Sequence, residues 1–144
     1  MSDSRTARTV ALVTVLTASG ACTAGTADVF SLQPGECFDE PDDPTEQLTE
    51  VAIVDCEEPH DNQVYALFDV DDGEFPGDEV AGLARDGCIE RFEDHVGFAY
   101  ADAELFATWL YPSSASWDDG DREVICVLFD EDRQLEGVQQ GAGR

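Results

Sequence analysis

The alternation of hydrophobic and polar residues predicts two strands in the middle of the chain. Residues 51–56 alternate between the two faces of a strand, and residues 64–70 do the same. The second of these segments is expected to direct one row of side chains to a single face: Val64, Ala66, Phe68 and Val70. Only a short turn, Pro59 to Asn62, separates the two segments, so we expect them to be antiparallel neighbours. A further turn, Pro34-Gly35, is predicted before Cys37.

A spacing of three and four residues predicts one long helix after a polar loop at residues 71–77. Asp78 is the expected N-cap of this helix, and Gly97 is the expected residue after its last turn. The apolar stripe of the helix contains six residues: Val80, Leu83, Ala84, Cys88, Phe92 and Val96. We expect this stripe to lie on a sheet.

Residues 123–129 are apolar on both faces, which is typical of a central strand. Residues 105–111 fit either a strand or a short helix. There are no internal repeats. The predicted fold class is therefore α+β, with a small antiparallel sheet packed against one main helix and two disulfides.

The N-terminal pattern predicts an export signal over residues 1–21. Arg5 and Arg8 precede a short apolar run at residues 10–16, and small residues follow it. The run is too short to span a membrane. The residues from Ser19 to Cys22 are similar to a bacterial lipobox, although Ser19 stands where Leu is usual. We predict a lipid on Cys22 and a location on the outer face of the cytoplasmic membrane; the alternative is a freely secreted protein. Residues 22–29 would be a short tether, and residues 30–144 the domain.

Export exposes cysteines to an oxidising environment, where they pair. Without Cys22, four cysteines remain, and four allow three connectivities. Cys88 lies on the buried stripe of the helix, so its partner should lie on the sheet beneath, and Cys126 meets that requirement. We therefore predict disulfides Cys88–Cys126 and Cys37–Cys56.

The charge of the chain limits its partners. Its 144 residues carry 33 acidic and 7 basic side chains, all of the latter arginine, for a net charge of −26. Such a chain repels the phosphates of nucleic acids and of anionic lipids. The hydrophobic fraction of 42% is nevertheless enough for a folded core. We expect a protein partner, no nucleic acid, and membrane contact only through the lipid anchor.

Several residues could carry other chemistry, and each has a simpler interpretation. Cys56 and His60 could form half of a zinc motif or a Cys–His nucleophile pair. Both interpretations need the Cys56 thiolate, and a disulfide at Cys56 would remove it. We expect His60 to be a turn residue bonded to backbone. His95 is placed to interact with the dipole at the end of the helix. Trp109 and Trp117 are expected to be packing residues rather than a carbohydrate platform.

The acidic runs are expected to be solvated loops. The run from Asp69 to Glu74 resembles half of a calcium loop, but its glycine is one position early and Val80 stands where the last ligand, a Glu, belongs. Weak calcium binding remains an alternative. No pair of carboxylates can be singled out for glycoside hydrolysis. We therefore predict no cofactor, no metal and no catalytic residue.

The order of short motifs resembles the septum-formation domain of actinobacterial envelope proteins. Its G-x-C-F block matches residues 35–38, and its V-x-C-x-x-P-H block matches residues 54–60. Later blocks follow in the same order: Phe75-Pro76-Gly77, Cys88 with Phe92 and Val96-Gly97, Tyr111-Pro112, Trp117, Gly120-Asp121-Arg122 with Cys126, and the tail from Gly141 to Arg144. The resemblance covers residues 30–144. It implies an exported protein, often a lipoprotein, with a role in septum formation during cell division and without known catalytic residues.

These observations predict a non-enzymatic envelope lipoprotein that acts as an interaction module in division or wall assembly. The alternative is an extracytoplasmic small-ligand binder or a wall-acting enzyme. A deep pocket lined by Trp109, Trp117 and His60 would favour that alternative.

Overall fold

The computed structural model describes residues 25–43 and 49–143. The predicted signal peptide and Cys22 lie outside these residues. The elements follow one another in this order: β1 (Gly25–Asp28), η1 (Val29–Ser31), β2 (Cys37–Asp39), β3 (Glu50–Val54), β4 (Asn62–Asp69), α1 (Glu79–Val96), η2 (Tyr100–Asp102), β5 (Phe106–Leu110), α2 (Ser114–Asp118) and β6 (Glu123–Phe129). In the described part of the chain no helix is both long and apolar enough to cross a membrane.

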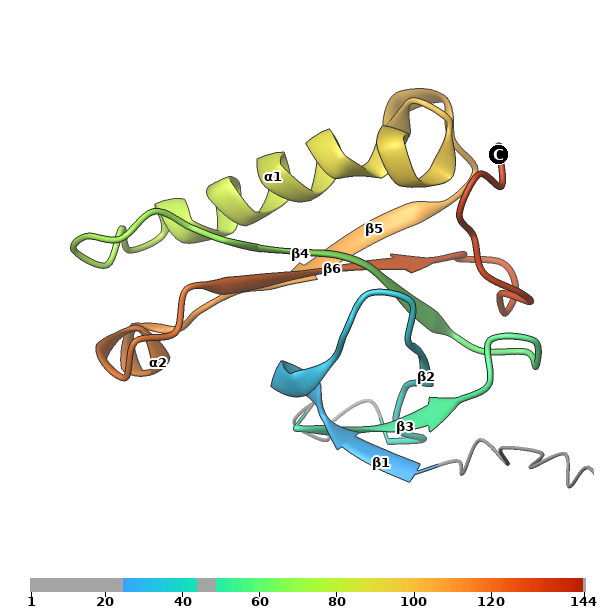
Figure 1. The fold of residues 1–144 in the computed structure, drawn as a ribbon, viewed down its shortest axis with the longest axis horizontal. Helices are drawn as coiled ribbons and strands as arrows, with labels where there is room; N and C mark the ends of the chain where they lie inside the picture. The colour runs from blue at the N-terminus through green and yellow to red at the C-terminus, as the bar shows by residue number, and fades with distance from the viewer. Residues whose placement is uncertain (1–24, 44–48, 144) are drawn as a thin grey trace, which may run out of the picture.

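The strands of the described residues form one antiparallel sheet in the order β1-β3-β2-β4-β6-β5. Together with α1, this sheet confirms the predicted α+β class. In Figure 1, α1 lies on one side of β4, β6 and β5, while β1, β3 and β2 lie on the other side. The sheet therefore folds over itself and buries both faces of its central strands.

The two faces of β6 belong to two separate hydrophobic cores. Val124, Cys126 and Leu128 pack in the core under α1. Ile125 and Val127 pack in the second core, with residues of η1, β2 and β3. This arrangement confirms β6 as a central strand and explains why its sequence is apolar at every interior position.

The predicted pairing of β3 with β4 is wrong. β2 lies between them and is antiparallel to both, so β3 and β4 run parallel to each other as second neighbours. A short connection does not require adjacency when a third strand is inserted. Here the disulfide Cys37–Cys56 holds the start of β2 beside the residues that follow β3.

The predicted face of β4 is wrong at Val64. A shift in register between Val64 and Ala66 sends Val64 into the second core, whereas Ala66 and Phe68 contact the core under α1. Tyr65 fills the irregularity on the helix side, where its hydroxyl donates to the Cys88 carbonyl at 2.7 Å. A bulge of this kind adds one residue to a strand and reverses the alternation beyond it.

Helix α1 confirms most of the predicted stripe, with two differences. Five of the six residues are buried, but Leu83 is 49% exposed. Asp78 occupies the N-cap position but makes no capping hydrogen bond with its side chain. Gly97 ends the helix as predicted, with a φ of 80° and its N–H donating to the Glu93 carbonyl at 2.8 Å.

Both predicted disulfides are present, Cys37–Cys56 and Cys88–Cys126. The second joins the buried face of α1 to β6, as the position of Cys88 in the stripe indicated. Residues 25–28, expected to be part of the tether, instead form β1 at the edge of the sheet. Residues 106–110 form a strand, which settles the ambiguity over residues 105–111.

Candidate functional site

An acidic cleft opens where β2 ends, β4 begins and β6 ends. Its volume is about 760 Å³, within the range of small-molecule sites. We call it the acidic cleft and define it by nine residues: Glu40, Asp61, Asn62, Phe129, Asp130, Glu131, Asp132, Arg133 and Gln134. Five of these carry carboxylates and one carries a guanidinium, so the cleft has a strongly negative surface.

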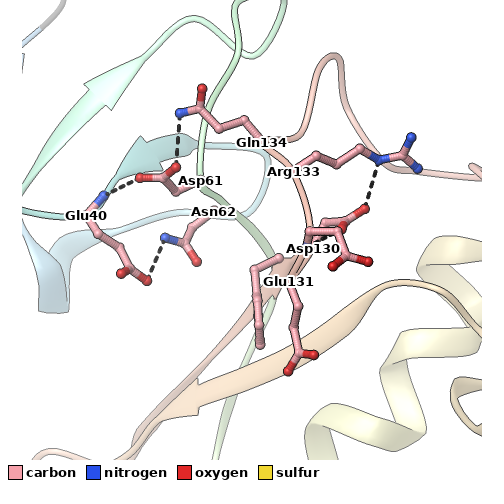
Figure 2. A pocket seen from close by; sticks show the side chains of 9 residues that line it. Glu40, Asp61, Asn62, Asp130, Glu131, Arg133 and Gln134 are labelled. Carbon is pink, nitrogen blue, oxygen red and sulfur yellow. Dashed lines mark hydrogen bonds and ion pairs between the residues drawn. The ribbon is translucent and has the colours of Figure 1, made fainter.

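Asp61 is the centre of one wall of the cleft (Figure 2). Its Oδ2 accepts from the Glu40 backbone N–H at 3.1 Å, and its Oδ1 accepts from the Gln134 amide at 3.0 Å. The Asp61 N–H in turn donates to Asp39 at 3.0 Å. The Glu40 carboxylate accepts from the buried Asn62 amide at 3.3 Å. Both carboxylates are thus fixed by donors from neighbouring segments.

The opposite wall is built on Asp130. Its side chain is only 8% exposed and accepts from the Arg133 guanidinium at 3.1 Å and from the Asp132 N–H at 3.0 Å. Glu131 and Asp132 are exposed at the rim. No group of three His, Cys, Asp or Glu residues in the described ranges is arranged to hold a metal ion. The negative charge that this wall presents to the solvent is that of Glu131 and Asp132.

The structure places His60 under the C-terminal segment. It is fully buried, its backbone pairs with Leu135, and its Nδ1 lies 2.8 Å from the Glu58 carbonyl. This agrees with the backbone-bonded turn residue that was expected. Cys56 is bonded to Cys37, so the proposed half of a zinc motif lacks its thiolate.

His95 lies in the last turn of α1, as predicted. Burial lowers its pKa below the ordinary value of 6.5, and its buried Nε2 has no hydrogen-bond partner among the described residues. Its ring lies against Tyr65, with centroids 5.7 Å apart. Burial at this place disfavours the charged imidazole, which is the form that would interact most strongly with the helix dipole.

The two tryptophans are packing residues in different places. Trp109 on β5 is half-buried against the core under α1. Trp117 on α2 is 5% exposed and borders a groove beside α1. His60 lies at the other end of β4, so the structure does not bring these three residues into one deep pocket.

Sequence reasoning found only part of the acidic cleft. The sequence predicts its acidic runs to be solvated loops, and Asp130 to Asp132 is one of these runs, but nothing in it singles out Glu40 or Asp61. Their meeting depends on β2 pairing with β4, which the predicted strand order lacked. The only local signal was the position of Asp61 beside the Pro-His motif.

The comparison with protein families gives one finding. A family model described as septum formation matches residues 8–126, which is well over half of the chain. The match contains all four paired cysteines and ends before the loop that forms one wall of the acidic cleft. No curated protein and no solved structure matches the chain.

Proposed function

From the premise that this chain belongs to the septum-formation family, we propose that it is a non-enzymatic envelope lipoprotein that works by binding a protein partner. The family supports a septum-related function in the cell envelope. The finer proposal is that the acidic cleft binds a basic patch on another envelope protein, on the outer side of the cytoplasmic membrane.

The observation that carries this proposal is the way the cleft carboxylates are held. Asp61 and Asp130 each accept two hydrogen bonds from this chain's own groups. They are therefore held in a fixed orientation by this chain's own donors. A fixed negative surface with exposed Glu131 and Asp132 at its rim suits a cationic protein surface.

The position of Cys22 supports a close attachment to the membrane. Two residues, Thr23 and Ala24, separate Cys22 from the first residue of β1. At about 3.5 Å per residue, a lipid on Cys22 would keep the first residue of β1 within about 10 Å of the membrane surface. The two disulfides fit the oxidising compartment that this location implies.

The anchor is tested by Cys22→Ala in the producing cell. We expect the wild type to fractionate with membranes and to incorporate a labelled fatty acid, and the variant to lose the label and either to be released or to remain unprocessed. A wild type that is soluble and carries no lipid would show that the protein is secreted.

The cleft is tested by the double change Glu131→Gln and Asp132→Asn, with Glu93→Gln and Asp94→Asn on α1 as the control. All four side chains are exposed, and both pairs remove two negative charges. Crosslinking in intact envelopes and imaging of a fluorescent fusion should show loss of partner capture and of septal enrichment in the cleft variant only.

Two outcomes would contradict this function. An even distribution of the fusion together with normal septa in a deletion strain would remove the division role. Loss of function from Asp61→Asn alone, with partner capture and folding intact, would favour an enzyme.

A further inference from the structure

A second hollow, the α1 groove, lies at the opposite end of β4 from the acidic cleft. The cleft contains Asn62, the first residue of β4, whereas the groove contains Asp69, the last. The groove has a volume of about 570 Å³ and lies between α1, the loop after β4 and α2. Figure 1 shows this loop and α2 at the same end of the molecule. Its apolar lining includes Phe68, Leu83 and Trp117.

The Phe68 side of the groove is rigidly built. The Arg91 guanidinium lies over the Phe68 ring, 4.2 Å from its centroid, and donates to the Gly87 carbonyl at 2.8 Å. The ring packs so closely on α1 that a Cβ at Gly87 would overlap it. Phe68 therefore has a fixed position under Arg91, whose guanidinium also lies 3.9 Å from a Glu90 carboxylate oxygen.

The Trp117 side is held equally firmly. The indole N–H donates to the Gly73 carbonyl at 3.1 Å, and the Arg122 guanidinium stacks 3.7 Å from the ring centroid. The Phe75 ring packs edge-on, with centroids 5.6 Å apart. These contacts fix the wall of the groove before any ligand arrives, which lowers the entropy cost of binding.

Leu83 lies at the edge of this groove without being covered. Its neighbours in the stripe, Val80 and Ala84, are 3% and 0% exposed, whereas Leu83 is 49% exposed. Leu83 is thus an apolar residue on the core-facing side of α1, and the described part of the chain leaves about half of it exposed to solvent. Together with Phe68 and Trp117 it offers an apolar site for a side chain from outside.

The rim of the groove is acidic. Five carboxylates line it: Asp69, Asp71, Asp72, Glu74 and Glu90. Arg122 donates to Asp72 at 3.0 Å but is also stacked on Trp117. Burial, and after it the charges of Asp69 and Asp121, raises the pKa of Glu123, which pairs with Asp69 across the sheet. An occupant of the groove must therefore combine apolar and cationic groups.

We propose that the α1 groove docks a segment of a partner protein in which one apolar side chain is flanked by lysine or arginine. The apolar side chain would lie on Phe68, Leu83 and Trp117, and the cations would meet the acidic rim. A second copy of this chain is a poor occupant, because its own net charge of −26 repels the rim. The inference rests on the proposed binding function but assigns it a surface separate from the acidic cleft.

The test uses the oxidised, exported protein and a short acetylated and amidated peptide with a central Leu between pairs of Lys. Isothermal titration calorimetry should show saturable binding that weakens as salt rises. Leu83→Ser should weaken binding about tenfold, because the apolar contact is lost at an exposed position. Glu90→Gln should weaken it less and should reduce the salt dependence.

Matched controls separate docking from simple charge attraction. Replacing the central Leu of the peptide by Ser, or its Lys residues by Glu, should abolish measurable binding. Glu93→Gln, exposed on the same helix, should bind the peptide as the wild type does. Equal weakening by Glu90→Gln and Glu93→Gln, or no effect of Leu83→Ser in a protein of unchanged urea stability, would overturn the proposal.

The outcome also separates this inference from the proposed function. If the peptide does not bind, while the variant at Glu131 and Asp132 still loses its envelope partner, the groove proposal fails and the binding function stands. If groove variants lose peptide binding while the cleft variant retains it, the groove is established as an independent docking site.

Discussion

Alanine substitutions at two glycines of α1 should have different effects on stability. Glycine in a helix interior costs about 1 kcal/mol relative to alanine. A Cβ at Gly82 meets no atom within 4 Å, so Gly82→Ala should stabilise the domain by about 1 kcal/mol. A Cβ at Gly87 would overlap the Phe68 ring, and overpacking of this kind costs about 1–3 kcal/mol. For Gly87→Ala the gain in helix propensity and the cost of overpacking oppose each other. The free energy of unfolding should therefore change by between about zero and about −2 kcal/mol.

Urea unfolding of the oxidised protein measures both effects as a change of midpoint at constant slope. The cause is isolated by a double-mutant cycle with Phe68→Ala. Once the ring is absent, Gly87→Ala should stabilise the protein by about 1 kcal/mol, as Gly82→Ala does. If Gly87→Ala already stabilises the protein as much as Gly82→Ala while Phe68 is present, the close packing of α1 on β4 is refuted.

Three further changes probe the core under α1. Replacing both Cys88 and Cys126 by Ala should lower the free energy of unfolding by about 4 kcal/mol, because the disulfide closes a loop with a sequence separation of 38. The measurement is urea unfolding without reductant, and an unchanged midpoint would contradict the prediction. Tyr65→Phe should lower the free energy of unfolding by about 1–2 kcal/mol in the same assay, because the buried Cys88 carbonyl loses its hydroxyl donor. An unchanged stability would show that this hydrogen bond does not stabilise the domain. His95 has a pKa lowered by burial, so the unfolded chain binds its proton more readily than the folded one. The wild type should therefore lose more stability than His95→Gln between about pH 7.5 and about pH 5.5, and parallel losses would argue against a buried neutral His95.

The local features of the fold could be predicted from the sequence. The spacing of the apolar stripe located α1, and Gly97 marked its end, because both depend on residues within a few turns of each other. The disulfide Cys88–Cys126 followed from the same periodicity, since a buried helix face can meet only the sheet beneath it. Each of these features can be predicted from residues that are close together in the sequence.

The non-local features could not be predicted in the same way. The pairing of β2 with both β3 and β4 involves a strand of three residues, Cys37–Asp39, which is too short to show alternation. The bulge at Tyr65 reverses the faces of β4 because the sheet folds over there, with one core on each side. Both features arise from tertiary packing, and the acidic cleft depends on the first of them, because it joins Glu40 to Asp61.

Leu83 is the one residue of the predicted α1 stripe that is not buried. Leu83 has the spacing of a buried residue. β4, however, ends at Asp69, and from there the chain continues into the loop that borders the groove. The stripe of α1 thus contains a residue that the chain's own packing leaves half uncovered. Disagreement between a local pattern and the tertiary structure is expected where a residue serves function instead of folding. On the docking proposal, the remaining coverage of Leu83 comes from a binding partner, and the acidic rim would favour a cationic one.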